Sequence, residues 1–361
     1  MSRGFRLLSG RFGAWLVLFL LAGLFGVFRL TPHATDPAPA SIPEGSPGWY
    51  TVYFTDPLAS ATTGRSAGPD EDLAAAIAKA RASVDVATYE LNLWTIRDAL
   101  QQAQSRGVQV RVVVDSDNVL EPEVQALESS GIPVLGDRRE GLMHHKFVVL
   151  DGEEVWTGSM NLTLSDGYYN DNNLLRVRSP LLAQNYDREF GEMFVKDRFG
   201  DASRKDTPFP VLEVEGTVVE NLFSPDDGVA RRIVQLLSQA RSSIEFMAFA
   251  YTSEELAETM LDRSRSGVAV RGVFEASQVE GGASQFSRLR DAGLDVRLDG
   301  NPRNLHHKVI LIDGQIVITG SYNFSRSAEI RNDENVLIMH NPELAQSYRA
   351  EFERVMGLAV P

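Results

Sequence analysis

The sequence predicts an α/β fold built from two copies of one unit. Landmark residues recur at a nearly constant spacing along the chain, and strand-like and helix-like segments alternate within each copy. Strands that alternate with helices form sheets whose faces the helices cover. The chain has 361 residues, which suffices for two domains, and it has no cysteine, which excludes disulfides, thiolate–zinc sites and iron–sulfur clusters.

Residues 1–30 are not expected to belong to this fold. They carry four arginines and no acidic residue, and an uncharged, mostly apolar run spans 12–28. A basic start followed by such a run is typical of an export signal or a membrane anchor. We expect a single-pass anchor in the cell membrane with an extracytoplasmic catalytic body; the alternative is a secreted protein whose signal has been cleaved.

Residues 31–48 contain five prolines and predict an extended tether. Without the four arginines of residues 1–30, 31 of the 35 basic residues remain against 49 acidic ones, so the rest of the chain has a net charge of −18. Such a body attracts long polyanions only weakly, although a local basic cleft stays compatible with this charge.

The repeat is visible as identical letters at a fixed spacing. Several groups near the centre of each copy recur at one constant spacing, and landmarks nearer the N-terminus recur at a slightly shorter one. We therefore expect a first repeat over residues 49–200 and a second repeat over 201–361. The groups that share the constant spacing are His144, His145 and Lys146 with His306, His307 and Lys308, Asp151 with Asp313, and the Thr-Gly-Ser-x-Asn segments at 157–161 and 319–323.

Hydrophobic periodicity and turn residues predict the elements of each repeat in order. In the first repeat, we expect helices at 73–80 and 94–103, strands at 83–89 and 108–115, and a hairpin of strands at 147–150 and 155–157. In the second repeat, we expect helices at 229–240 and 254–264, strands at 243–251 and 268–275, and a closing helix at about 343–355.

The repeated letters form the pattern His-x-Lys-x4-Asp-x6-Gly-Ser-x-Asn. Residues two apart on a strand point to one face, so His144 and Lys146 are expected side by side. The turn at Asp151 returns the chain, and Ser159 and Asn161 then lie on the next strand. The second repeat presents the same four side chains, at His306, Lys308, Ser321 and Asn323.

A pseudo-twofold packing of the repeats would bring the two sets face to face. Two imidazoles, two ammonium groups and two pairs of neutral donors suit an anionic tetrahedral group, above all a phosphodiester. One imidazole can attack phosphorus, and the other can protonate the leaving oxygen and then activate water. The lysines supply the positive charge, so we expect neither a metal nor another cofactor.

The duplicated pattern resembles the HKD motif of the phospholipase D superfamily, and the resemblance covers essentially all of residues 49–361. It implies two similar units, each a mixed β-sheet flanked by helices, related by a pseudo-twofold axis and joined across one active site. It also implies cleavage or transfer of phosphodiesters through a phosphohistidine. The motif aspartates Asp151 and Asp313 would then mainly support structure.

The resemblance further implies that an acid or amide, at the same spacing after the first histidine of each motif, bonds the histidine of the opposite repeat. Those positions hold Glu334, which would orient His144, and Asn172, which would orient His306. A carboxylate stabilises an imidazolium better than an amide does. We therefore expect His144 to be the nucleophile and His306 the general acid and base; the reverse assignment is the alternative.

The leading hypothesis is a membrane-tethered phosphodiesterase of phospholipase D type that hydrolyses phospholipid headgroups. Three alternatives remain: a nuclease of the same superfamily, a cardiolipin synthase-like phosphatidyl transferase and a non-catalytic phosphate-binding module. The acidic body disfavours the nuclease, the single candidate membrane helix disfavours the transferase, and the intact histidines disfavour the module. Because one chain contains both motifs, a monomer suffices for a complete site.

Overall fold

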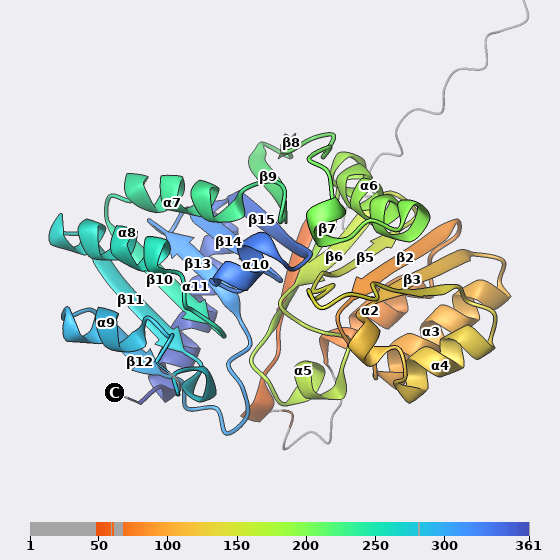
Figure 1. Ribbon diagram of the computed structural model, residues 1–361, viewed down its shortest axis with the longest axis horizontal. Coiled ribbons are helices and arrows are strands. Elements are labelled where there is room, and N and C mark those ends of the chain that lie inside the picture. Colours follow the sequence, from red (N-terminus) through yellow and green to blue (C-terminus); the bar gives the residue numbers. More distant parts are fainter. Residues whose placement is uncertain (1–47, 59, 61–67, 281, 361) are drawn as a thin grey trace, which may run out of the picture. The chain divides into compact units, whose positions relative to one another are not determined.

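The computed structural model of the protein describes residues 48–58, 60, 68–280 and 282–360. The expected anchor at 1–30 and all but the last residue of the expected tether lie outside the described residues. Within the described part, no helix is both long and apolar enough to cross a membrane. The described chain forms two β-sheets with helices on their faces, which confirms the predicted α/β class (Figure 1).

The first sheet has seven strands in the order β1-β7-β6-β5-β2-β3-β4. The β2–β3 and β3–β4 pairs are parallel and the other pairs are antiparallel, so the sheet is mixed. Its strands are β1 (Tyr50–Phe54), β2 (Ser83–Thr88), β3 (Gln109–Val114), β4 (Val134–Gly136), β5 (Lys146–Leu150), β6 (Glu154–Gly158) and β7 (Asn173–Arg178).

The second sheet repeats this arrangement and adds one edge strand, in the order β12-β11-β10-β13-β14-β15-β9-β8. Again, the β10–β11 and β11–β12 pairs are parallel and the others antiparallel. Its strands are β8 (Val211–Val214), β9 (Thr217–Ser224), β10 (Ser243–Ala248), β11 (Ala269–Phe274), β12 (Asp295–Leu298), β13 (Lys308–Ile312), β14 (Ile316–Gly320) and β15 (Glu334–His340).

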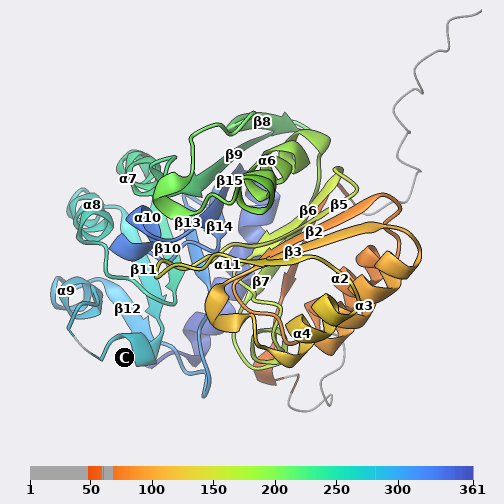
Figure 2. The same ribbon diagram turned by 45° about the vertical axis from the view of Figure 1, so that its right-hand side comes forward.

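Helices cover both sheets. Figures 1 and 2 show α2, α3 and α4 against the first sheet and α7, α8 and α9 against the second, with α6 and α11 nearer the middle. The larger helices are α2 (Pro69–Ile77), α3 (Trp94–Ser105), α4 (Pro122–Ser129), α6 (Pro180–Lys196), α7 (Val229–Gln239), α8 (Glu254–Arg265) and α11 (Pro342–Leu358); α5 (Leu164–Tyr168), α9 (Phe286–Asp291) and α10 (Arg326–Ile330) are short.

The two inner helices join the repeats through one apolar core. Each helix begins with a side-chain cap followed by proline, Ser179 on α6 and Asn341 on α11, which fixes where the helix starts. Aromatic residues four positions apart then lie on one helix face and are buried. They pack in a single cluster with the inward faces of β5, β13 and their neighbours, so the core continues from one repeat into the other.

Candidate active site

The motif histidines lie just before their strands, because β5 starts at Lys146 and β13 starts at Lys308. The prediction that His144 and Lys146 share a strand is therefore wrong by two positions. The backbone gives the reason: the N–H of His144 donates to the carbonyl of Asp333 at 2.9 Å, and the N–H of His306 donates to that of Asp171 at 2.8 Å. Each histidine thus pairs with the opposite repeat instead of its own sheet.

Ser159 and Asn161 also lie outside a strand, directly after β6 ends at Gly158. Gly158 has a φ of 155°, and a Cβ there would collide with the carbonyl of Asn173 on β7. This close approach lets the N–H of Ser159 reach the same carbonyl at 3.1 Å. The hairpin therefore presents the imidazole, the ammonium, the hydroxyl and the amide at one end, as the sequence indicates.

Side chains of the two motifs lie close enough to influence each other's protonation. Burial, together with the ammonium groups of Lys146 and Lys308, lowers the pKa of His144 to about 4, although Glu334 opposes this shift. Burial and the same two lysines hold the pKa of His306 well below its ordinary value. The charge of a lysine of the opposite repeat thus lowers the pKa of each histidine, and both histidines are neutral at neutral pH.

Glu334 contacts His144 directly. Its Oε2 lies 2.7 Å from Nδ1 of His144 and also accepts the hydroxyl of Ser321 at 2.7 Å. Burial pushes the pKa of Glu334 upward, but the imidazole and Lys146 hold it below its ordinary value, so the carboxylate is ionised. An ionised acceptor on Nδ1 places the proton there and leaves Nε2 of His144 with a free electron pair.

His306 has two oxygen partners on Nδ1. The Oδ1 of Asn172 lies at 2.9 Å, and the Oδ2 of Asp166 lies at 3.3 Å. Asp166 is buried and is fixed by the N–H of Asn161 at 2.7 Å and the side chain of Asn170 at 2.6 Å. Asp166 could not be predicted from the repeat, because its counterpart in the second repeat is Ala328.

We expect Asp166→Asn to lower kcat about ten- to a hundredfold, because the loss of its charge destabilises an imidazolium at His306. The same loss lowers the pKa of His306, so the alkaline limb of the pH–rate profile should shift to lower pH. A profile of kcat against pH for the wild type and the variant measures both effects. A profile with unchanged limbs would contradict a role of Asp166 through His306.

The second repeat suggests the control for this prediction, since there the carboxylate comes from the Glu334 position. Adding Asn172→Asp to Asp166→Asn moves the charge to the equivalent position in the first repeat and should restore the alkaline limb. Recovery would separate an electrostatic role from a purely structural one.

The two motif lysines are buried, and each bonds back to the histidine of its own motif. Lys146 Nζ donates to the carbonyl of His144 at 3.1 Å, and Lys308 Nζ donates to that of His306 at 2.7 Å. Burial lowers the pKa of Lys146 to about 8, and burial together with the charge of Lys146 lowers that of Lys308 well below its ordinary value. Burial thus disfavours the charged forms of both lysines in the empty site, and a bound phosphate would stabilise them.

The side-chain amides of the two motifs are incompletely hydrogen-bonded. The side-chain oxygens of Asn161 and Asn323 are buried, and neither has a hydrogen-bond partner among the described residues. Buried polar atoms are nearly always bonded, and the exchange of amide oxygen and nitrogen would turn each atom into a donor. Two equivalent unpartnered amides, one per repeat, fit a ligand with several acceptor oxygens.

Asp151 and Asp313 lie at the opposite end of the hairpin from the histidines. The length of β5 separates Lys146 from Asp151 by roughly 16 Å. Asp151 has a φ of 55°, and its carboxylate accepts the backbone N–H groups of Arg81, Ala82 and Ser83 at 2.7–3.0 Å. Although partial burial raises the pKa of Asp151, these donors hold it below its ordinary value.

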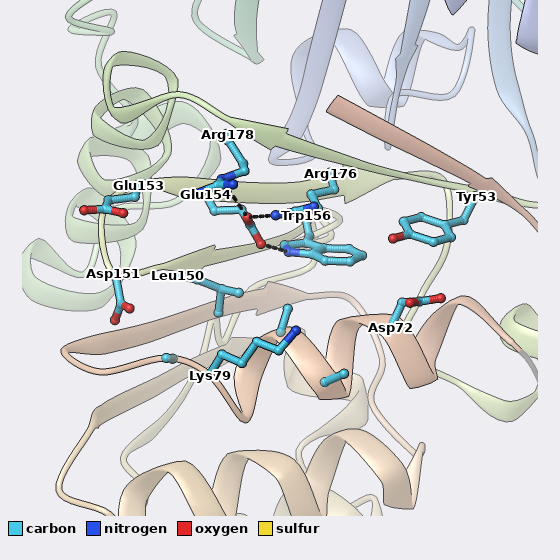
Figure 3. A pocket seen from close by; sticks show the side chains of 13 residues that line it. Tyr53, Asp72, Lys79, Leu150, Asp151, Glu153, Glu154, Trp156, Arg176 and Arg178 are labelled. Atoms are coloured by element: carbon cyan, nitrogen blue, oxygen red, sulfur yellow. Dashed lines mark hydrogen bonds and ion pairs between the residues drawn. The ribbon is translucent and has the colours of Figure 1, made fainter. Parts of the chain in front are cut away.

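Asp313 accepts the equivalent N–H groups of residues 241–243 at 2.7–3.0 Å. Each aspartate thus ties the hairpin turn to the loop before the neighbouring strand. Asp151 also borders a cavity of about 490 Å³ between α2 and β6, whose charged lining Figure 3 shows. No motif histidine or lysine lines this cavity.

The second histidine of each motif faces away from the candidate site. Nε2 of His145 lies 3.0 Å from Glu189 on α6, and Nε2 of His307 lies 3.0 Å from Glu351 on α11. These pairs connect each hairpin to the inner helix of its own repeat. Within the part of the chain that the structure describes, His, Asp and Glu side chains form no cluster of three or more that could hold a metal ion.

The mixed sheets and the paired motifs define the class of protein, the phospholipase D superfamily. The family model described as "Cardiolipin synthase, PLD-like domain" matches residues 73–194 and again residues 233–356. The chain belongs to this family and contains two copies of its domain. The superfamily and the two-repeat fold predicted from the sequence are thereby confirmed.

Curated relatives align with less than half of this chain. The mitochondrial cardiolipin hydrolase of Chlamydomonas reinhardtii is 28% identical over 188 residues, which cover 45% of this chain and 84% of the relative. A phospholipase D of Rickettsia felis is 31% identical over 175 residues, which cover 48% of this chain and 87% of the relative. Each alignment has about the length of one repeat.

A solved structure matches both repeats together. The crystal structure of phosphatidylserine synthase from Haemophilus influenzae covers 84% of this chain and 85% of its own chain, with a TM-score of 0.62 and 14% identity. At this identity, the likeness shows a shared fold alone. It supports the arrangement of two similar mixed α/β units in one chain.

Proposed function

We propose that the protein hydrolyses the headgroup phosphodiester of phospholipids through a phosphohistidine intermediate. Family membership supports phosphodiester chemistry, and the names of the relatives, cardiolipin hydrolase and phospholipase D, support a lipid substrate. The observation that carries the proposal is the paired arrangement of His144 with Glu334 and His306 with Asn172 and Asp166, each beside a buried motif lysine.

In the first step, Nε2 of neutral His144 attacks phosphorus and forms the P–N bond, while the bond from phosphorus to the headgroup oxygen breaks. The departing oxygen takes a proton from Nε2 of His306. For this step His306 must be an imidazolium. The negative charge of the bound phosphodiester raises the pKa of His306 from its low value in the empty site, and Asp166 beside Nδ1 stabilises the imidazolium once it forms.

In the second step, His306 is neutral and removes a proton from water. The water oxygen bonds to phosphorus, the P–N bond breaks, and His144 regains its neutral form. Lys146, Lys308 and the two motif asparagines stabilise the charge that develops on the phosphoryl oxygens. Glu334 stabilises the positive charge of the phosphorylated imidazole between the two steps.

The location of the protein is part of the proposal. We infer from the basic start and the apolar run at 12–28 that residues 1–30 anchor the chain in the cell membrane and that the catalytic body lies outside the cytoplasm. An anchored enzyme meets its lipid substrate without binding from solution. Cleavage of this segment would instead give a secreted enzyme.

The full-length protein, purified in detergent, should release the headgroup of phosphatidylcholine or the phosphatidylglycerol moiety of cardiolipin. The rate should be unchanged by EDTA, because lysines supply the positive charge of the site. Headgroup release measured by chromatography, with EDTA and without it, tests both statements. Loss of turnover in EDTA would contradict metal independence.

Two further substrates distinguish the alternatives. Single-stranded DNA tests the nuclease, and its cleavage without any lipid turnover would overturn the proposal. Phosphatidylglycerol as sole lipid tests the transferase that the family description suggests, since two molecules would give cardiolipin and glycerol. Binding of lipid without turnover of any diester would identify a phosphate-binding module.

A further inference from the structure

The two repeats differ at two exposed positions near the candidate site. The first repeat has Trp94 and Leu120, and the equivalent positions of the second repeat hold Glu254 and Glu280. Trp94 is 62% exposed and Leu120 is 79% exposed. Both glutamates are exposed as well.

Backbone hydrogen bonds place Trp94 next to the motif. The N–H groups of Asn92 and Leu93 both donate to the carbonyl of Leu162, at 2.9 and 3.1 Å, and Leu162 directly follows Asn161. Trp94 is the next residue of the chain. The second repeat makes the same pair of bonds from Thr252 and Ser253 to Phe324, so Glu254 occupies the equivalent place.

Leu120 also lies near the motif. The side chain of Asn118 donates to the carbonyl of Tyr89 at 2.9 Å, and the Tyr89 ring lies 5.4 Å from the His144 ring in an edge contact. Leu120 comes soon after Asn118, in the turn after the 3₁₀ helix Ser116–Asn118. Trp94 and Leu120, which we call the apolar rim, thus lie on two segments of the first repeat: the first adjoins Asn161, and the second is bonded to the loop of Tyr89 beside His144.

Folding does not account for the apolar rim. Helix α8 starts with Ser253 as a side-chain cap and with Glu254 and Glu255 in its first turn, all of which stabilise a helix start. Helix α3 starts at Leu93 and Trp94, without a side-chain cap and without an acid in its first turn. The start of α3, where tryptophan is exposed, therefore has fewer stabilising interactions than the start of α8. Such a local loss of stability is typical of functional positions.

We propose that the apolar rim of Trp94 and Leu120 inserts into the surface of a lipid bilayer and places the His144 side of the site against the headgroups. The inference rests on the proposed lipid substrate. Tryptophan favours the membrane–water interface, and leucine favours the apolar layer beneath it. Because the body carries a net charge of −18, apolar insertion rather than charge attraction holds the rim to the bilayer.

The absence of cysteine from the chain allows a test at single positions. Leu120→Cys and Glu280→Cys, each labelled with an environment-sensitive dye, are compared in the full-length protein reconstituted in phosphatidylcholine vesicles. The dye at position 120 should be quenched by brominated lipid and should shift to shorter wavelength, and neither effect should change with salt. The dye at position 280 should show neither. Equal behaviour at both positions would overturn the proposal.

Activity gives a second, independent readout. Trp94→Glu with Leu120→Glu copies the second repeat and should lower headgroup release from vesicles at least about tenfold. Hydrolysis of the soluble diester bis(p-nitrophenyl) phosphate should stay within about twofold, and Glu254→Gln with Glu280→Gln should change neither rate. Equal loss on both substrates would contradict insertion. If the wild type cleaves the soluble diester but no lipid, the lipid substrate itself fails, whereas the dye experiment still decides on bilayer contact.

Discussion

The His144→Ala variant is expected to lose phosphodiester turnover by a factor of about 10⁴ or more, because it lacks the nitrogen that bonds to phosphorus. The backbone N–H of residue 144, which donates to the carbonyl of Asp333, remains in the variant. The fold should therefore persist, as circular dichroism and the melting temperature would show. Turnover of bis(p-nitrophenyl) phosphate by the full-length protein measures the loss.

The same substrate separates the roles of the two histidines. Nitrophenolate leaves without a proton, so His306→Ala should still perform the first step and release one nitrophenolate per chain in a burst. The second step should then be slow, because no base activates water, and mass spectrometry should find the p-nitrophenylphosphoryl group on residue 144. A burst from His144→Ala and none from His306→Ala would reverse the assignment.

The repeat made much of the site predictable from the sequence. Identical letters at a fixed spacing identify the histidines, lysines, serines and asparagines without any knowledge of the fold. The alternation of strands and helices also predicts which end of the hairpin presents them. The inner helix α6 was missed, although Ser179 and Pro180 form the same start signal as Asn341 and Pro342 on α11.

Other features of the site depend on contacts between distant residues. His144 and His306 leave their sheets because their N–H groups find acceptors in the opposite repeat, and local periodicity cannot predict such pairing. Asp166 could not be predicted from the sequence for a related reason. The charge near His306 comes from a position whose counterpart in the second repeat is alanine, so a search for repeated letters passes over it.

The differences between the two repeats follow one pattern. The repeats keep the motif and the backbone bonds that hold it, but they diverge at the acid beside each histidine, at the rim and at the inner helices. Duplication provides two similar half-sites, and an asymmetric reaction needs a nucleophile on one side and an acid on the other. In the proposed mechanism, divergence at the contacts of the histidines would favour these separate roles.

The inner helices carry the divergence with the largest expected effect on stability. Glu351 beside His307 is bonded by Arg354, which holds its pKa at about 2 although burial alone would raise it. The first repeat has Glu192 in place of this arginine. Burial, followed by the charges of Glu192 and nearby aspartates, raises the pKa of Glu189 to about 8.

Glu189 keeps its proton in the folded state up to about pH 8 but loses it near its ordinary value in the unfolded chain. Its contribution to stability is therefore complete below the ordinary pKa of a glutamate and is lost as the pH rises from there toward 8. Between about pH 6 and pH 9, the free energy of unfolding of the wild type should fall by roughly 2–3 kcal/mol through this group. Glu189→Gln, which stays neutral beside His145, should remove most of that fall.

Urea unfolding of both proteins at several pH values measures the difference. Glu351→Gln is the matched control: Glu351 is ionised throughout this range, so its loss should lower stability equally at every pH and leave the slope unchanged. Parallel profiles for the wild type and Glu189→Gln would show that Glu189 is ionised in the folded protein. In that case, Glu189 would be a buried carboxylate 3.0 Å from His145, as the Arg354-bonded Glu351 is beside His307 in the second repeat.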